Sequence, residues 1–206
     1  MTTADEDARQ RPDDTTSYAQ ARRDFTWEVA DDYNFAFDAV GRWAEEPDKL
    51  AMLWVGPDGR EERFTFAAFD EQSSRVANAL KKLGVAKGER VLLMLPRVPE
   101  WWETMLGLMK LGAVGIPCTT LLTAKDLEYR AGVAEAVALV TDTAGAEKWA
   151  AVRARCPSVR LTMVVGEPGD DCPAQCVGYH PATDIAAPVW YDRVTRADDP
   201  CLIYFT

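Results

Sequence analysis

The sequence predicts an α/β fold, in which a doubly wound and mostly parallel sheet carries helices on both faces. Short apolar runs alternate with longer segments whose apolar residues recur at helical spacing, and this alternation indicates parallel strands joined by right-handed crossovers. The strand-like runs are apolar throughout, as expected for strands that are covered on both faces.

Residues 1–24 are rich in Asp, Arg, Thr and Gln, and this composition predicts a disordered polar tail. Residues 25–206 are predicted to form the folded part. Aromatic and apolar residues at helical offsets predict a helical segment within 25–43. Residues 51–66 then hold two strand-like runs around Gly-Pro-Asp-Gly, which predicts a β-hairpin.

A helix is predicted from residue 66 to residue 83, because apolar side chains fall on one stripe of that segment. Thr65 is suited to cap its amino end, and Gly84 stands where a left-handed C-cap belongs. A strand is predicted at 90–95.

Pro96 ends that strand, and Pro99 opens the next helix at a position where a missing N–H costs nothing. Gly112 is predicted to end this helix. Thr123 and Asp126 have the spacing of a capping box for a helix to about residue 134. The remaining elements are predicted as a helix at 145–155, a loop-rich stretch at 166–199 and strands at 113–116, 137–141, 161–165 and 201–205.

Composition and charge exclude several functions. The chain has 206 residues and a net charge of -10, which argues against a broad nucleic-acid or anionic membrane interface. No apolar stretch is long enough to span a bilayer. The first residues are acidic and polar, unlike a secretory signal or a transit peptide, so a cytoplasmic location is predicted.

The five cysteines suggest no metal centre. Cys118 and Cys201 lie in apolar runs and are predicted to be buried. Cys172, Cys176 and His180 form the one cluster with metal-ligand residue types, but its spacing matches no structural zinc pattern. Because Gly and Pro surround the cluster, a surface loop is the favoured interpretation and no metal ligand is predicted.

Familiar catalytic motifs are missing. The chain has no Gly-x-Gly-x-x-Gly, no Gly-x-x-x-x-Gly-Lys-Ser/Thr and no Gly-x-Ser-x-Gly, which are the marks of dinucleotide sites, phosphate loops and nucleophile elbows. The single histidine is favoured as an exposed loop residue. No catalytic residue is predicted.

Three segments carry a resemblance to a known family. Residues 95–102, Leu-Pro-Arg-Val-Pro-Glu-Trp-Trp, resemble a signature of AMP-forming acyl-CoA synthetases, in their medium-chain branch. Residues 116–130 resemble the same branch further along. Residues 199–206, Asp-Pro-Cys-Leu-Ile-Tyr-Phe-Thr, resemble the strand that leads into the phosphate loop of these adenylate-forming enzymes.

The resemblance implies an acid–CoA ligase that uses ATP, magnesium and coenzyme A, and that takes a medium-chain fatty acid or an aryl acid. It places Thr206 at the first position of the ATP phosphate loop. It places Arg130 and Leu121 near the coenzyme A channel, although relatives can carry a polar residue where Leu121 stands. For Arg130 a surface salt bridge on its helix is the favoured interpretation.

The resemblance extends only to the N-terminal portion of such an enzyme, an incomplete AMP-binding domain. Residues 25–206 would be that portion, truncated before the phosphate loop. The chain alone is therefore expected to be inactive and to bind ATP, magnesium and coenzyme A poorly. Two alternatives stay open. One is a standalone protein-binding module without catalysis, and the other is one half of a split ligase.

Overall fold

The computed structural model describes residues 15–166 and 176–205, and the chain divides into two units, Met1–Ala30 and Asp31–Thr206. The first unit contains helix α1 (Thr15–Asp24), in which the side chains of residues 18–24 are mostly exposed. The described part of the segment predicted to be a disordered tail is thus helical. The domain boundary at residue 25 stays a prediction.

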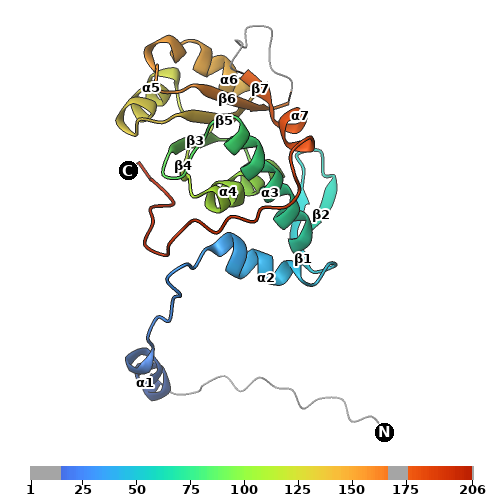
Figure 1. Ribbon diagram of the computed structural model, residues 1–206, viewed down its shortest axis with the longest axis vertical. Coiled ribbons are helices and arrows are strands. Elements are labelled where there is room, and N and C mark those ends of the chain that lie inside the picture. Colours follow the sequence, from blue (N-terminus) through green and yellow to red (C-terminus); the bar gives the residue numbers. More distant parts are fainter. Residues whose placement is uncertain (1–14, 167–175, 206) are drawn as a thin grey trace. The chain divides into compact units, whose positions relative to one another are not determined.

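The second unit contains a five-stranded parallel sheet in the order β4-β3-β5-β6-β7 (Figure 1). All four pairings are parallel, which confirms the predicted α/β class. The strands are β3 (Arg90–Met94), β4 (Val114–Pro117), β5 (Ala138–Asp142), β6 (Leu161–Val165) and β7 (Cys176–Gly178).

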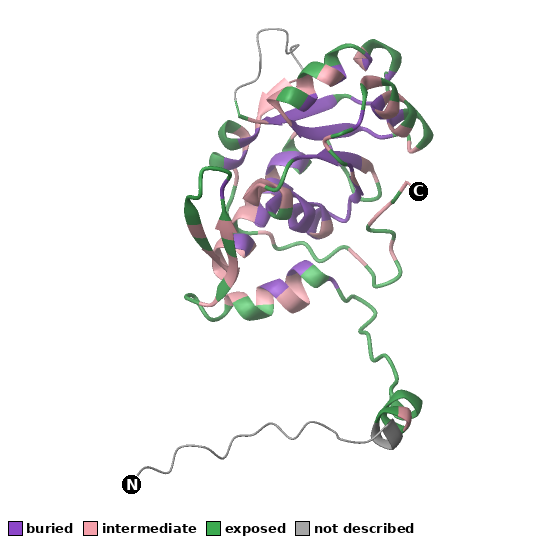
Figure 2. Cartoon of the chain, turned by 180° about the vertical axis from the view of Figure 1, so that it is seen from behind, coloured by how far each residue is buried: buried purple, intermediate pink, exposed green. Residues whose placement is uncertain are grey.

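Helices cover both faces of this sheet, so the sheet is doubly wound as predicted. Alternate residues of β3 enter different cores: Val91 and Leu93 pack in one cluster, and Leu92 and Met94 pack in the other. The sheet is accordingly the most continuously buried part of the chain in Figure 2. The first core is covered by α3 (Phe66–Lys82), α4 (Pro99–Leu111) and α7 (Tyr179–Asp184), and the second by α5 (Ala124–Val133) and α6 (Thr143–Ala150).

Three of the predicted helix ends are confirmed, whereas the helix predicted at 145–155 runs from Thr143 to Ala150 and a separate 3-10 turn follows at Arg153–Arg155. The Thr65 side chain accepts a hydrogen bond from the Ala68 N–H at the start of α3. Thr123 and Asp126 form a reciprocal capping box at the start of α5. Gly112 ends α4 with a φ of 74°, in the left-handed region that glycine adopts without steric cost.

The predicted hairpin is also confirmed, as the antiparallel strands β1 (Leu50–Val55) and β2 (Glu61–Thr65). Before it, residues 36–44 form η1 (Ala36–Gly41) and α2 (Arg42–Ala44). The helical segment predicted within 25–43 therefore begins later than its first aromatic residues, because residues 25–34 are not helical.

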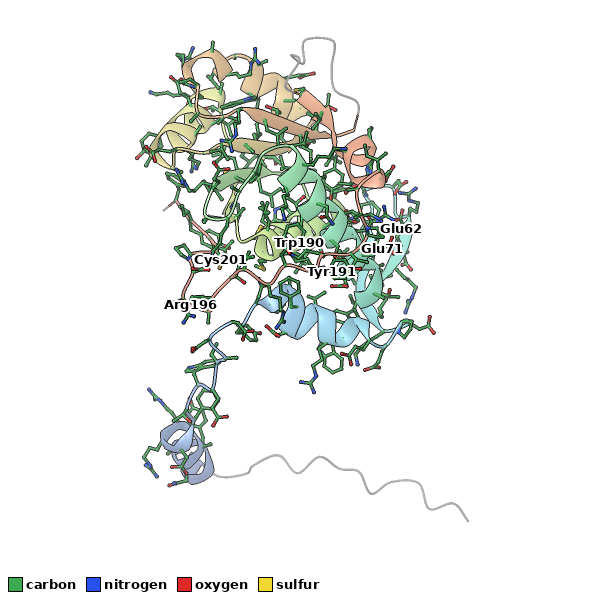
Figure 3. All side chains as sticks on the ribbon, in the orientation of Figure 1. Glu62, Glu71, Trp190, Tyr191, Arg196 and Cys201 are labelled. Carbon is green, nitrogen blue, oxygen red and sulfur yellow. The ribbon has the colours of Figure 1, made fainter. Side chains whose placement is uncertain are left out.

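An irregular segment of residues 185–200, which we call the strap, follows α7 and runs along α3 (Figure 1). Asn78 of α3 donates from Nδ2 to the carbonyls of Ala187 and Val189, at 2.9 and 3.0 Å. Figure 3 shows Trp190 and Tyr191 on the strap. The loop-rich stretch predicted at 166–199 thus also contains β7 and α7.

The buried strand predicted at 201–205 is wrong. The segment makes a single parallel bridge, between Leu202 and Gly115 of β4, and the Cys201 and Tyr204 side chains are exposed. One bridge on one side leaves the rest of the segment without strand partners. The predicted burial of Cys201 is wrong for the same reason, whereas that of Cys118 is confirmed.

Candidate functional site

The carboxyl edge of the parallel sheet is the candidate functional site. From β3 the chain passes through α4, on one face, to its neighbour β4. It then crosses through α5, on the other face, to β5 on the far side of β3. Ligands in open α/β sheets bind outside the carboxyl ends of the strands, at such a change of direction.

A cavity of about 300 Å³ lies at the carboxyl ends of β3 and β4. Among its polar groups, the Arg97 guanidinium makes no ion pair with any described residue. The cavity therefore offers one free cation beside hydroxyl groups and indole rings. Its lining residues are Leu95, Pro96, Arg97, Trp101, Trp102, Thr119 and Thr120.

Two hydrogen bonds hold the loops around this cavity. The indole N–H of Trp54, on β1, donates to the Arg97 carbonyl oxygen at 2.8 Å, so the hairpin fixes the loop that follows β3. Lys148 of α6 donates from Nζ to the Thr120 carbonyl oxygen at 2.7 Å and fixes the loop that follows β4. The loops are therefore held from both faces of the sheet.

Two of the three predicted site residues, Leu121 and Arg130, are described by the structure, and neither lines the cavity. Leu121 is 85% exposed in the loop after β4. Arg130 is partly buried on α5, with Cζ 5.2 Å from the centre of the Phe205 ring. No salt bridge of Arg130 occurs among the described residues, so the surface ion pair favoured for it is wrong. Thr206 lies outside the described residues.

Arg97 is a cavity residue that the sequence did not single out for binding. Its signal in the sequence was its place directly after a buried strand, at the carboxyl edge where ligands gather. That signal could not show whether the guanidinium is free.

Cys118, at the end of β4, is not an activated nucleophile. Burial raises the pKa of its thiol to about 11, although the nearby Arg130 guanidinium opposes this. A thiol with such a pKa stays protonated near neutral pH, and the thiolate is the reactive form.

Of the Cys172, Cys176 and His180 cluster, the structure describes Cys176 and His180. Cys176 is disulfide-bonded, and His180 Nε2 lies 3.2 Å from Glu100 Oε1. Cys172 lies outside the described residues. Within residues 15–166 and 176–205 no three His, Cys, Asp or Glu side chains gather as metal ligands would.

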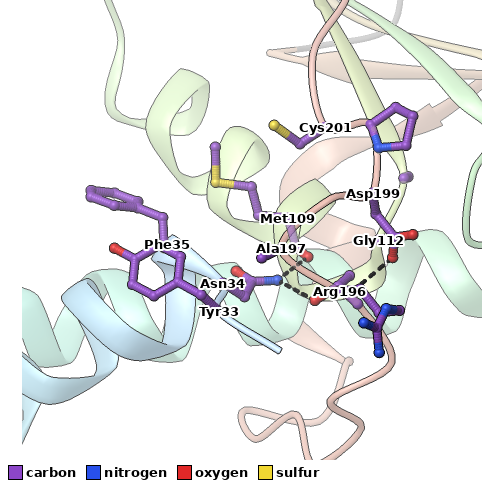
Figure 4. Close-up of a pocket in the computed structure, with 12 residues that line it drawn as sticks. Tyr33, Asn34, Phe35, Met109, Gly112, Arg196, Ala197, Asp199 and Cys201 are labelled. Carbon is purple, nitrogen blue, oxygen red and sulfur yellow. Dashed lines mark hydrogen bonds between the residues drawn. The ribbon is translucent and has the colours of Figure 1, made fainter. Parts of the chain in front are cut away.

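Apart from the cavity at the carboxyl edge and one between α3 and α7, the described residues line two further cavities. One, of about 160 Å³, is near the amino end of β4 (Figure 4), where Asn34 bonds to its protein neighbours. The other, of about 510 Å³, we call the apolar groove. Its lining is almost wholly apolar: Phe35, Val40, Ala51, Met52, Phe66, Phe69, Trp101, Trp102, Met105, Leu106, Met109, Leu202 and Tyr204.

Helices among the described residues are all too short or too polar to cross a membrane.

Comparisons with known proteins show the family of this chain. The family model described as AMP-binding enzyme matches residues 40–206. Acyl-coenzyme A synthetase ACSM5, mitochondrial, of Rattus norvegicus is 34% identical over 196 residues, which cover 88% of this chain and 33% of that protein. Acyl-coenzyme A synthetase ACSM1, mitochondrial, of Homo sapiens is 32% identical over 87% of this chain and 32% of its own length.

Solved structures share the fold. An acyl-CoA synthetase of Brucella canis superposes with a TM-score of 0.81 at 24% identity, covering 92% of this chain and 36% of that one. The anthranilate CoA ligase AuaEII, in complex with anthranoyl-AMP, gives a TM-score of 0.73 at 24% identity over 84% of this chain and 32% of its own. The chain thus spans about a third of the length of the relatives it matches.

Proposed function

Because this chain belongs to the AMP-binding enzyme family, we propose that it serves in the AMP-forming ligation of a carboxylic acid to coenzyme A. In the first step a carboxylate oxygen attacks the α-phosphorus of ATP, and pyrophosphate leaves. In the second step the coenzyme A thiol attacks the acyl carbon, loses its proton and displaces AMP. The family match, which spans residues 40–206, is the observation that carries this proposal.

Arg97 is our proposed contact for an anionic group of a ligand. Its guanidinium is free among the described residues and lies in the cavity with Thr119 and Thr120. A guanidinium with adjacent hydroxyl donors suits a phosphate or a carboxylate. Trp101 and Trp102 supply an apolar wall to the same cavity.

Arg130 and Leu121 remain proposed neighbours of coenzyme A, and Thr206 remains the proposed first residue of a phosphate loop. Arg130 supports this in one respect, since it stacks on Phe205, the residue directly before Thr206. Magnesium is implied by the family's use of ATP, but the described residues hold no cluster of three ligands for it. No step is therefore assigned to a metal in this part of the chain.

The acid is proposed to be a medium-chain fatty acid or an aryl acid. The AuaEII structure holds anthranoyl-AMP, an aryl adenylate, and the mammalian relatives are named acyl-coenzyme A synthetases. Those relatives are named as mitochondrial, so the cytoplasmic location predicted from the sequence stays a prediction.

We also propose that the 206 residues alone do not turn over substrate, because they span about a third of the relatives' length and contain none of the phosphate-loop motifs. Loss of one preorganised charge stabiliser costs about a hundred- to a thousandfold in rate. The test is pyrophosphate release with ATP, magnesium and octanoate or benzoate. Turnover above a no-protein control would contradict this proposal.

A hybrid enzyme tests the ligase function itself. The matching segment of the rat ACSM5 relative would be replaced by this chain, and acid-dependent pyrophosphate release measured in a folded, monodisperse hybrid. A ligase portion should support turnover, and Arg97→Ala should reduce it while Arg60→Ala does not. A folded hybrid without turnover would favour the protein-binding alternative, which the apolar groove supports. Activity on simply mixing the two pieces would favour a split ligase.

A further inference from the structure

Two pairs of side chains join helix α7 to the first turns of α4. The Tyr179 hydroxyl donates to Glu103 Oε2 at 2.8 Å. Next to it, His180 Nε2 lies 3.2 Å from Glu100 Oε1. Glu100 and Glu103 are three residues apart on α4 and so share one face of that helix. Adjacent residues of α7 therefore meet adjacent carboxyl groups of α4.

The inner pair is removed from water. Glu103 is 8% exposed and Tyr179 is 1% exposed, while His180 is exposed. Burial raises the pKa of the Glu103 carboxyl, and the Glu100 charge raises it further, although the Tyr179 hydroxyl and His180 oppose the shift. A buried carboxyl without an ion pair costs least in its protonated form.

Charged groups from the other packed elements do not neutralise Glu103. On α3, Arg75 pairs with Glu71 and donates to the carbonyl oxygens of Asp184 and Ala186, at the far end of α7. On β7 the one titratable side chain, Cys176, is disulfide-bonded. Among the described groups, those that shift the Glu103 pKa are Tyr179, Glu100 and His180.

We propose that Glu103 and Tyr179 form a proton-sensitive clasp, which holds α7 on α4 and loosens as the pH rises. The burial of Glu103 and the nearness of Glu100 favour this direction. When Glu103 loses its proton, a negative charge appears in a buried site beside the carboxylate of Glu100, and separation of α7 from α4 lets water reach that charge.

The pH dependence of folding stability is expected to have the same direction. A carboxyl whose pKa is higher in the folded protein than in the unfolded one holds its proton more tightly when folded. Stability is then fully present below the ordinary value of 4.5 and is lost as the pH rises through the folded pKa. Since one proton is involved, the unfolding equilibrium constant rises by up to about tenfold per pH unit in that range.

The clasp lies beside the candidate site. Trp101 and Trp102, which line the cavity at the carboxyl edge, stand between Glu100 and Glu103 on α4. A change in how α7 holds this turn of α4 therefore acts on the helix that carries the cavity wall. The inference is independent of the proposed ligase function.

The test compares Glu103→Gln with the unmodified 206-residue chain between pH 4 and pH 9. Glutamine keeps an oxygen that accepts from Tyr179 but has no proton to lose. Urea unfolding gives the equilibrium constant at each pH. Hydrogen exchange of the amides at 179–184, corrected for intrinsic rates, reports on α7 itself. Glu46→Gln, at an exposed position, is the matched control.

We expect the unmodified chain and Glu46→Gln to lose stability, and protection of the α7 amides from exchange, as the pH rises. In Glu103→Gln the pH dependence of the unfolding equilibrium constant should be weaker by up to about tenfold per pH unit, the contribution of one proton. Tyr179→Phe removes a hydrogen-bond donor that favours the ionised form of Glu103 and so lowers its pKa. Without this donor the loss of stability should extend to higher pH. Equal slopes for the unmodified chain and Glu103→Gln would overturn the clasp. So would a stability slope without any change in α7 exchange.

Discussion

Asn34 and Thr195 are 161 positions apart in the chain, yet Nδ2 of Asn34 donates to Oγ1 of Thr195 at 2.9 Å. The same amide nitrogen donates to the Met109 carbonyl oxygen at 2.7 Å (Figure 4), and Oδ1 accepts from the Ala36 N–H at 2.9 Å. One buried amide thus joins the start of η1, the end of α4 and the strap.

Asn34→Ala is expected to lower the free energy of unfolding by about 2–4 kcal/mol, because it removes three hydrogen bonds. The Met109 carbonyl oxygen and the Ala36 N–H both lose the Asn34 side chain as a partner. Asn34→Asp should also destabilise, since a carboxylate cannot donate to Met109. Urea denaturation of each variant measures the effect. Thr195→Val, which removes one acceptor, should cost about 1 kcal/mol. If Thr195→Val and Asn34→Ala lowered the free energy of unfolding equally, the Asn34 amide would not be joining three segments as proposed.

The strap should detach when its helix contacts are removed. Asn78 donates to two strap carbonyls, and Lys81 Nζ lies 2.7 Å from Asp192 Oδ2. Asn78→Ala should cost about 1 kcal/mol locally, and trypsin cleavage after Arg193 should then accelerate by roughly fivefold if it follows the open population. Gln72→Ala, on the same helix, is the control. Unchanged cleavage in Asn78→Ala would show that these bonds do not hold the strap.

The described free cysteines should differ sharply in reactivity. Cys201 is exposed, and Cys118 is buried with its thiol pKa raised to about 11. Because the thiolate reacts, iodoacetamide at pH 8 should label Cys201 well before Cys118, as measured by mass spectrometry of the peptides. Cys201→Ser should remove the fast label. Labelling of Cys118 at the same rate in the native protein would contradict its burial.

The apolar groove should bind a hydrophobic dye. Trp102 is 38% exposed at its rim, and an accessible apolar surface of this kind attracts apolar ligands. Trp102→Gln should weaken the fluorescence enhancement of such a dye, while Leu121→Gln, outside the groove, should not. Equal enhancement in both variants, at unchanged unfolding midpoints, would place the dye elsewhere.

Local signals in the sequence were sufficient for the element types and most of their ends. Thr65, Pro99, Gly112 and the Thr123–Asp126 pair act within a few residues of their own position, so their effect follows from neighbours in the chain. Apolar runs likewise indicated buried strands and hence a doubly wound sheet. Sequence motifs were also sufficient for the family, which the match over residues 40–206 confirms.

The tertiary structure alone decided which groups face one another. The apolar run at 201–205 has the pattern of a buried strand, but burial depends on the strands beside it, and a single bridge to β4 leaves Cys201 exposed. Lys110 is 1% exposed because Asp70 and Ser74 of α3 happen to face it, each 2.8 Å from Nζ. The tertiary structure likewise decided that the Arg97 guanidinium has no ion-pair partner among the described residues and that Glu103 meets Tyr179. Each depends on contacts between segments far apart in the chain, which a local residue pattern does not encode.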